Sequence, residues 1–115
     1  MTARNVVIAG DYEGKMVIQS FGKLSINSMF KTYAELNKKT IKDYEIINEK
    51  TQKSVVSAVG RGFVGSLILG PIGLLAGLSA SSKGTHLIAV EFKNGDKSLL
   101  EIDDKIYEKM IKTMF

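Results

Sequence analysis

Apolar and polar residues alternate most regularly near the end of the chain, over residues 86–92. A period of two residues predicts a strand with one face in the core. Residues 98–102 form a returning strand, and the intervening Asn94-Gly95 favours a type I′ turn because both residues tolerate positive φ angles. One face of the first strand consists of His86, Ile88, Val90 and Phe92. We therefore expect an antiparallel hairpin.

The apolar spacing lengthens to about 3.6 residues after this hairpin, as in an amphipathic helix. Either Asp103 or Asp104 can cap the helix, because an aspartate oxygen accepts hydrogen bonds from free N–H groups of the first turn. We expect the helix to run to the C-terminus. Its apolar stripe consists of Ile106, Tyr107, Met110, Ile111 and Met114.

Short apolar runs within residues 1–50 predict further strands. A tight turn at residues 20–22 joins two of them. Residues 28–37 fit either a helix or a loop, because apolar residues have helical spacing but are flanked by Lys and Thr. The predicted strands are residues 6–8, 15–19, 21–26 and 41–47.

Residues 54–82 differ from the rest of the chain because Arg61 is their only charged residue. Gly70-Pro71 would end one helix and begin another, since Gly suits the position after a helix and Pro suits its first turn. We predict an apolar, Gly-rich helical hairpin here. The fold expected for residues 1–115 is one α+β domain, with a mostly antiparallel sheet, this hairpin and a C-terminal amphipathic helix.

Three interpretations of this segment compete. Residues 60–65 match the G-x-G-x-x-G pattern of dinucleotide-binding turns, but the following helix would meet Gly70-Pro71 within two turns. Residues 63–78 carry no charge, yet they fall short of the about 20 residues that a spanning helix needs. Helices that are apolar all round must be covered on both sides, and self-association does so economically. We favour self-association.

We accordingly predict a homo-oligomer whose interface includes residues of the apolar segment. Gly73 and Gly77 form a G-x-x-x-G pattern, which lets helices approach closely. The predicted interface side chains are Phe63, Leu67, Leu74 and Leu78.

Arg61 lies between Gly60 and Gly62, and a charge in such apolar surroundings is costly unless it is paired or reaches water. It fits an exposed turn, an ion pair with Glu45 or Glu91, or a site where the guanidinium binds an anion beside glycine amides. We name Arg61, Gly60 and Gly62 as candidate ligand-binding residues.

The chain has 16 Lys and Arg residues, 12 Asp and Glu residues, one His and no Cys, for a net charge of +4. This composition excludes disulfides, thiolate metal sites, Cys nucleophiles and any multi-histidine site within one chain. The interspersed acids argue against a nucleic-acid binder. No nucleophile motif or acid–base pair is present, so we expect no enzyme, cofactor or metal.

Individual polar residues favour structural roles. Tyr12 and Glu13 occupy a glycine-flanked turn, a place where binding residues also occur. His86 is read as an ordinary edge residue. Glu101, Asp103 and Asp104 are read as helix caps and first-turn acids rather than metal ligands.

The densest basic stretch is read as a solvated face with weak attraction for anions. It comprises Lys31, Lys38, Lys39 and Lys42, diluted by Glu35 and Asp43. Residues 1–5 are followed by a run of only four apolar residues before Gly10, which is too short for a signal peptide, so we expect a cytoplasmic protein, with membrane association as the alternative.

Residues 40–47, the Gly-rich insert, residues 89–99 and the terminal helix together resemble small uncharacterised proteins of low-GC Gram-positive bacteria and their phages. Strands followed by a C-terminal capping helix also resemble bacterial pleckstrin-homology-like domains. This resemblance implies a non-enzymatic binding module. We expect a self-associating interaction protein, for instance a phage or mobile-element inhibitor that binds a host factor or sequesters a small anionic, nucleotide-like signal. The alternative is a membrane-associated accessory protein that uses the Gly-rich segment.

Overall fold

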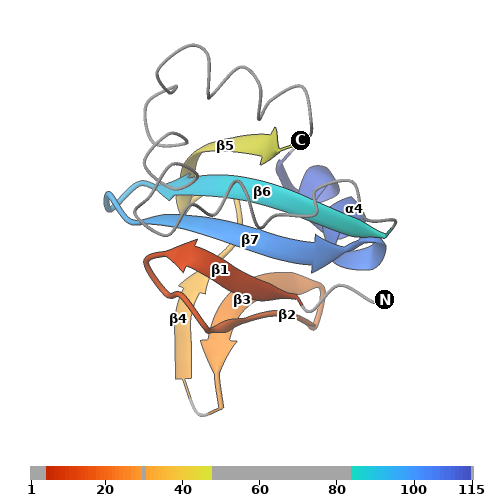
Figure 1. Cartoon of the computed structure of the whole chain (residues 1–115), viewed down its shortest axis with the longest axis horizontal. Helices are drawn as coiled ribbons and strands as arrows, with labels where there is room; N and C mark the ends of the chain where they lie inside the picture. The colour runs from red at the N-terminus through yellow and green to blue at the C-terminus, as the bar shows by residue number, and fades with distance from the viewer. Residues whose placement is uncertain (1–4, 30, 48–83, 115) are drawn as a thin grey trace.

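The computed structural model describes residues 5–29, 31–47 and 84–114. Within these ranges the chain forms strands and one helix, labelled as in Figure 1. The strands are β1 (Val6–Gly10), β2 (Met16–Ser20), β3 (Lys23–Ser28), β4 (Lys31–Glu35), β5 (Ile41–Ile47), β6 (Thr85–Phe92) and β7 (Lys97–Asp103), and the helix is α4 (Asp104–Met114).

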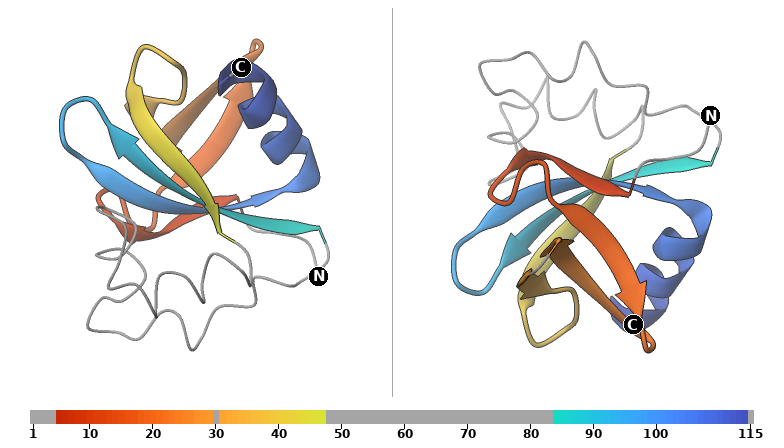
Figure 2. Two further views of the ribbon diagram at one scale, coloured as in Figure 1. Left: turned by 90° about the horizontal axis from the view of Figure 1, so that it is seen from above. Right: turned by 90° about the horizontal axis from the view of Figure 1, so that it is seen from below.

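All seven strands join one sheet in the order β4-β3-β2-β1-β7-β6-β5, and every neighbouring pair is antiparallel. The pairing of β1 with β7 brings the two ends of the described chain together, and a bulge lies between Val7 and Ala9. Figure 2 shows the sheet curving into a half-barrel with α4 along one side. The helix contacts β3, β6 and β7, so it links the two halves of the sheet.

The hydrophobic core lies between the concave face of the sheet and α4. Ile106 and Met110 are the two buried residues of the helix, and Tyr107 and Met114 pack half-buried beside them. These contacts explain the helical stripe, because a helix gains most of its stability from burying one face. The core residues are Val7, Val17, Leu24, Ile26, Leu36, Ile41, Ile88, Val90, Phe92, Leu100, Ile102, Ile106 and Met110.

Strands β6 and β7 are buried on both faces. Ile88 and Leu100 point into the core, whereas Leu87, Ala89 and Leu99 alternate with the core residues and are also buried. The alternation in the sequence therefore shows that these residues form a strand, but it does not mean that one face of the strand is exposed to solvent.

The hairpin between β6 and β7 is confirmed, but its turn is not of type I′. Gly95 has a φ of 99°, whereas Asn94 is not among the described residues with positive φ. Instead, the Asn94 side-chain oxygen accepts a hydrogen bond from the Asp96 N–H at 2.9 Å. This is an Asx-type turn, in which the side chain replaces a backbone acceptor.

The predicted fold class is wrong in its helical part. Strands make up 59% of the described chain and α4 is its only helix, so the fold is mostly β. No Gly-rich helical hairpin is seen, and residues 54–82, where we expected it, lie outside the described residues. Residues 28–37 form neither a helix nor only a loop, since β4 pairs with β3 there.

No helix in the described ranges is long and apolar enough to cross a membrane.

Candidate functional site

A pocket of about 380 Å³ opens where three segments meet that are far apart in the sequence: the β2–β3 turn, the β4–β5 connection and the last turn of α4. Its volume suits a small-molecule ligand. We call it the lysine pocket. Its lining residues are Gly22, Lys23, Leu24, Glu35, Leu36, Asn37, Lys38, Lys39 and Thr113.

The lysine pocket has an apolar floor and a basic rim. Leu24 and Leu36 are only 2% and 1% exposed, and they belong to the core of the sheet. Lys23, Lys38 and Lys39 are exposed around them. A ligand with an apolar part and a negative charge meets both surfaces here.

Asn37 fixes the β4–β5 connection in one conformation. Its side-chain oxygen accepts hydrogen bonds from the N–H groups of Lys39 at 2.8 Å and Thr40 at 3.2 Å. The Thr40 hydroxyl donates to the Glu35 carbonyl at 2.6 Å, which closes the turn from the other side. Because such side-chain bonds replace missing backbone partners, Lys38 and Lys39 extend from a rigid turn.

The β2–β3 turn brings Lys23 to the same place. Ser20 pairs with Lys23, which leaves only Phe21 and Gly22 as a two-residue loop. Their φ angles are 49° and 76°, and two positive φ angles define a type I′ turn. The Lys109 ammonium of α4 lies beside this turn, since a Cβ built on Gly22 would be 3.9 Å from the Lys109 Nζ.

Positive charge dominates the lysine pocket. Among the described residues, no carboxylate lies within 4.0 Å of the ammonium groups of Lys23, Lys38, Lys39 or Lys109. The one lining carboxylate, Glu35, accepts a hydrogen bond from the Asn37 amide at 3.1 Å. The nearby C-terminal end of α4 adds about −0.5 charge. The charges of the three lining lysines and of the neighbouring Lys109 outweigh these two negative contributions, so the pocket favours an anion.

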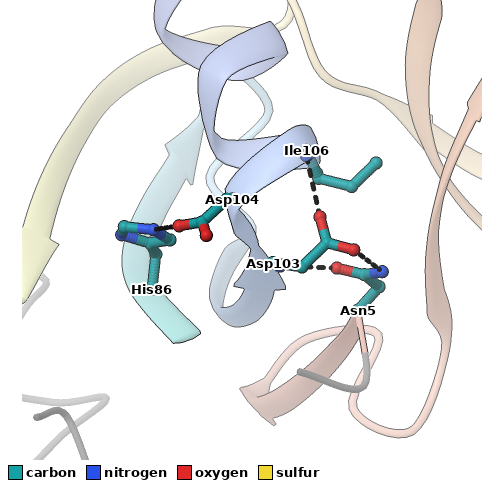
Figure 3. A network of polar contacts seen from close by, with 5 residues as sticks. All are labelled: Asn5, His86, Asp103, Asp104 and Ile106. Carbon is teal, nitrogen blue, oxygen red and sulfur yellow. Dashed lines mark hydrogen bonds and ion pairs between the residues drawn. The ribbon is translucent and has the colours of Figure 1, made fainter. Parts of the chain in front are cut away.

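A second polar cluster ties α4 to β1 and β6 (Figure 3). The Asp103 carboxylate accepts hydrogen bonds from the Ile106 N–H at 2.9 Å and from the Asn5 side-chain amide at 3.0 Å. The Asp103 N–H donates to the Asn5 side-chain oxygen at 2.8 Å. Asp103 is therefore the helix cap, which decides between the two candidates in the sequence.

Burial raises the pKa of the Asp103 carboxyl, but the hydrogen bonds from Asn5 and from the backbone of Ile106 and Lys105 outweigh it, so the net pKa lies below its ordinary value. Asp104 instead pairs with the His86 ring at 2.6 Å, and that ring stacks on Tyr107 with centroids 3.9 Å apart. These contacts give His86, Asp103 and Asp104 structural roles.

Tyr12 also has a structural role. Its hydroxyl donates to the Asp96 carboxylate, and its ring packs edge-on against Phe92 and tilted against Tyr33, with centroids 5.9 and 6.0 Å apart. The hydrogen bond to Asp96 and burial raise the pKa of Tyr12. Glu13 beside it is exposed. The glycine-flanked turn thus closes an end of the core.

The candidate ligand residues Arg61, Gly60 and Gly62 lie outside the described residues. The same holds for the predicted interface residues Phe63, Leu67, Gly73, Leu74, Gly77 and Leu78. Within the described ranges, no group of three or more His, Cys, Asp or Glu side chains is placed to hold a metal ion.

The four lysines of the basic stretch do not form one surface in the structure. Lys38 and Lys39 line the lysine pocket, whereas the Lys31 ammonium lies 4.9 Å from the ring centre of Tyr33 and Lys42 is on β5, away from the pocket lining. Sequence reasoning missed Lys23 and Lys109 because nothing local connects them to this stretch. The Asn-Lys-Lys-Thr run at residues 37–40 was the available signal, since Asn and Thr favour a tight turn.

No protein family, no curated protein and no solved structure matches the chain.

Proposed function

We propose that the protein is a small, non-enzymatic binding protein that takes a small organic anion in the lysine pocket. The observation that carries this proposal is the convergence of Lys23, Lys38, Lys39 and Lys109, without carboxylate partners among the described residues, around a pocket of about 380 Å³. Like charges brought together on rigid elements repel one another, and a bound anion relieves that repulsion.

The floor of the pocket narrows the ligand class. Most of the surface that the pocket exposes is apolar, and a bare inorganic anion cannot use such surface. An anion with a ring or an apolar body, such as a nucleotide, uses both the floor and the lysines. The described lining residues include no His and no Ser, and their one carboxylate is hydrogen-bonded to Asn37, which supports binding rather than catalysis.

We also propose a pleckstrin-homology-like architecture on the basis of the sequence resemblance alone; the strands form two meanders, β1 to β4 and β5 to β7, and α4 follows them. Fold alone does not give function. Self-association is likewise a proposal, and it rests on the sequence of residues 54–82. Light scattering tests it, since a particle of 12.6 kDa at micromolar concentration would be a monomer and would contradict it.

Calorimetry tests the anion site. The ligands are AMP, GMP, cyclic nucleotides and pyrophosphate, at low and physiological salt. We expect binding by the wild type to weaken with salt. The variant Lys38→Ala/Lys39→Ala should bind at least about tenfold more weakly, because each lost charged hydrogen bond is worth about 1.5–3 kcal/mol.

The matched control is Lys42→Ala/Lys93→Ala, which removes the same charge from exposed positions outside the pocket lining. It should keep wild-type affinity. An equal loss in both double variants would show only a nonspecific charge effect. No binding of any panel member by the wild type would overturn the proposal.

A further inference from the structure

Phe21 combines two properties that no other described residue except glycine shares. Its side chain is 101% exposed, and its φ of 49° lies in the left-handed region. Asn5 and Tyr12 also have positive φ angles, but Asn5 bonds to Asp103 and Tyr12 packs on Phe92. Phe21 has no comparable contact among the described residues.

The stability of the fold does not explain why a phenylalanine occupies position 21. The first position of a type I′ turn favours Asn, Asp or Gly, because a bulky side chain there is crowded against the backbone. An exposed ring also gains no hydrophobic stabilisation from the core. A residue that breaks a local rule without a stabilising contact points to a functional role.

The position of Phe21 suggests that role. It directly precedes Gly22 and Lys23, which both line the lysine pocket, and the Lys109 ammonium lies beside Gly22. Phe21 is not itself a lining residue, and its fully exposed ring projects into solvent beside this basic pocket. Proteins bind nucleotides by stacking bases on exposed aromatic rings while lysines contact the phosphates.

We infer that Phe21 is a ligand-binding residue of the lysine pocket, where its ring stacks on the planar ring of an aromatic anion, the class to which mononucleotides belong. The inference rests on the proposed function, because stacking adds to an anion already held by the lysines. The stacking contact would select for the planar ring of the ligand, which the lysines do not recognise.

The variant Phe21→Asn tests this inference with two probes, AMP and ribose 5-phosphate, which share a sugar and a phosphate but differ in the base. We expect Phe21→Asn to raise the melting temperature, because Asn suits the turn. Affinity for AMP should fall about tenfold, as the loss of one stacking contact implies. Affinity for ribose 5-phosphate should stay within about twofold.

The control is Met29→Asn, which changes another exposed apolar residue, 86% exposed, in the β3–β4 connection. It should leave both affinities unchanged. Equal AMP affinity in wild type and Phe21→Asn would overturn the stacking role and leave the anion site intact. An equal loss of both probes would overturn it too, since a ring contact cannot act on ribose 5-phosphate. If the wild type binds neither probe nor any other panel anion, the proposed function itself fails.

Discussion

Asn5 and Asp103 bind each other through two hydrogen bonds, although 98 positions separate them in the chain. The Asn5 amide donates to the Asp103 carboxylate, and the Asp103 N–H donates to the Asn5 side-chain oxygen. The same carboxylate caps α4 through the Ile106 N–H. The pair thus joins the first strand to the start of the helix.

We predict that Asp103→Ala lowers the free energy of unfolding by about 1–2 kcal/mol, because it removes a helix cap and a side-chain partner together. Urea unfolding followed by circular dichroism measures this. The matched variant Asp104→Ala removes an exposed carboxylate whose partner is His86, and it should cost only a few tenths of a kcal/mol. Equal costs would show that Asp103 is not the cap.

The low pKa of Asp103 predicts acid sensitivity. The folded state holds this carboxyl below its ordinary pKa, so its contribution is fully present above the unfolded pKa of about 3.9 and is lost as the pH falls through the folded value. Asp103→Asn keeps a capping side chain but does not titrate. The stability difference between wild type and this variant should therefore shrink between about pH 5 and pH 2. A difference independent of pH would contradict the prediction.

Two tyrosines in ring contact should titrate in opposite order. The hydrogen bond to Asp96 raises the pKa of Tyr12, while a hydrogen bond with Ser28 and the charge of Lys15 lower the pKa of Tyr33. Absorbance at the tyrosinate band separates them: Tyr33→Phe should remove an early-titrating phenol and Tyr12→Phe a late one. The contribution of Tyr12 to stability is present below its ordinary pKa of about 10 and is lost as the pH rises through the folded value. The reverse order of titration would refute this assignment.

We predict that Asn37→Ala loosens the β4–β5 connection and lowers the free energy of unfolding by about 1–2 kcal/mol, since the Lys39 N–H loses its acceptor and the Thr40 N–H keeps only the Asn37 backbone carbonyl. Hydrogen exchange of the Lys39 and Thr40 amides should accelerate. Asn37→Asp keeps the accepting oxygen and should retain more of that protection. Unchanged exchange in Asn37→Ala would show that the turn is held by other contacts.

The sequence was most informative where the structure is local. The β6–β7 hairpin and the start of α4 followed from apolar spacing and from the two aspartates, because period and capping act within a few residues. By contrast, the burial of β4 does not alternate cleanly, and its extended form depends on pairing with β3. A strand of this kind is defined by its neighbour more than by its own residues.

The two turns show why local signals also fail. Asn94-Gly95 has the preferred composition of a type I′ turn, yet Phe21-Gly22 adopts it. The strand register explains this difference, because Ser20 opposite Lys23 leaves a loop of two residues, and the twist of the strands favours positive φ angles in such a loop. The connection between the paired residues Glu91 and Lys97 is longer, so Asn94 does not need a positive φ angle.

Sequence patterns alone predict the strands of regular alternation and the terminal helix, and the composition excludes cysteine chemistry and shows the mild positive charge. The three-dimensional arrangement brings Lys23, Lys38 and Lys39 around one pocket and Lys109 beside its Gly22. Their meeting depends on the order of the strands and on how α4 crosses the half-barrel, and both are set by burying the same core residues from distant parts of the chain. Hydrophobic burial has no direction along the sequence, so no local pattern of lysines could have shown which of them become neighbours.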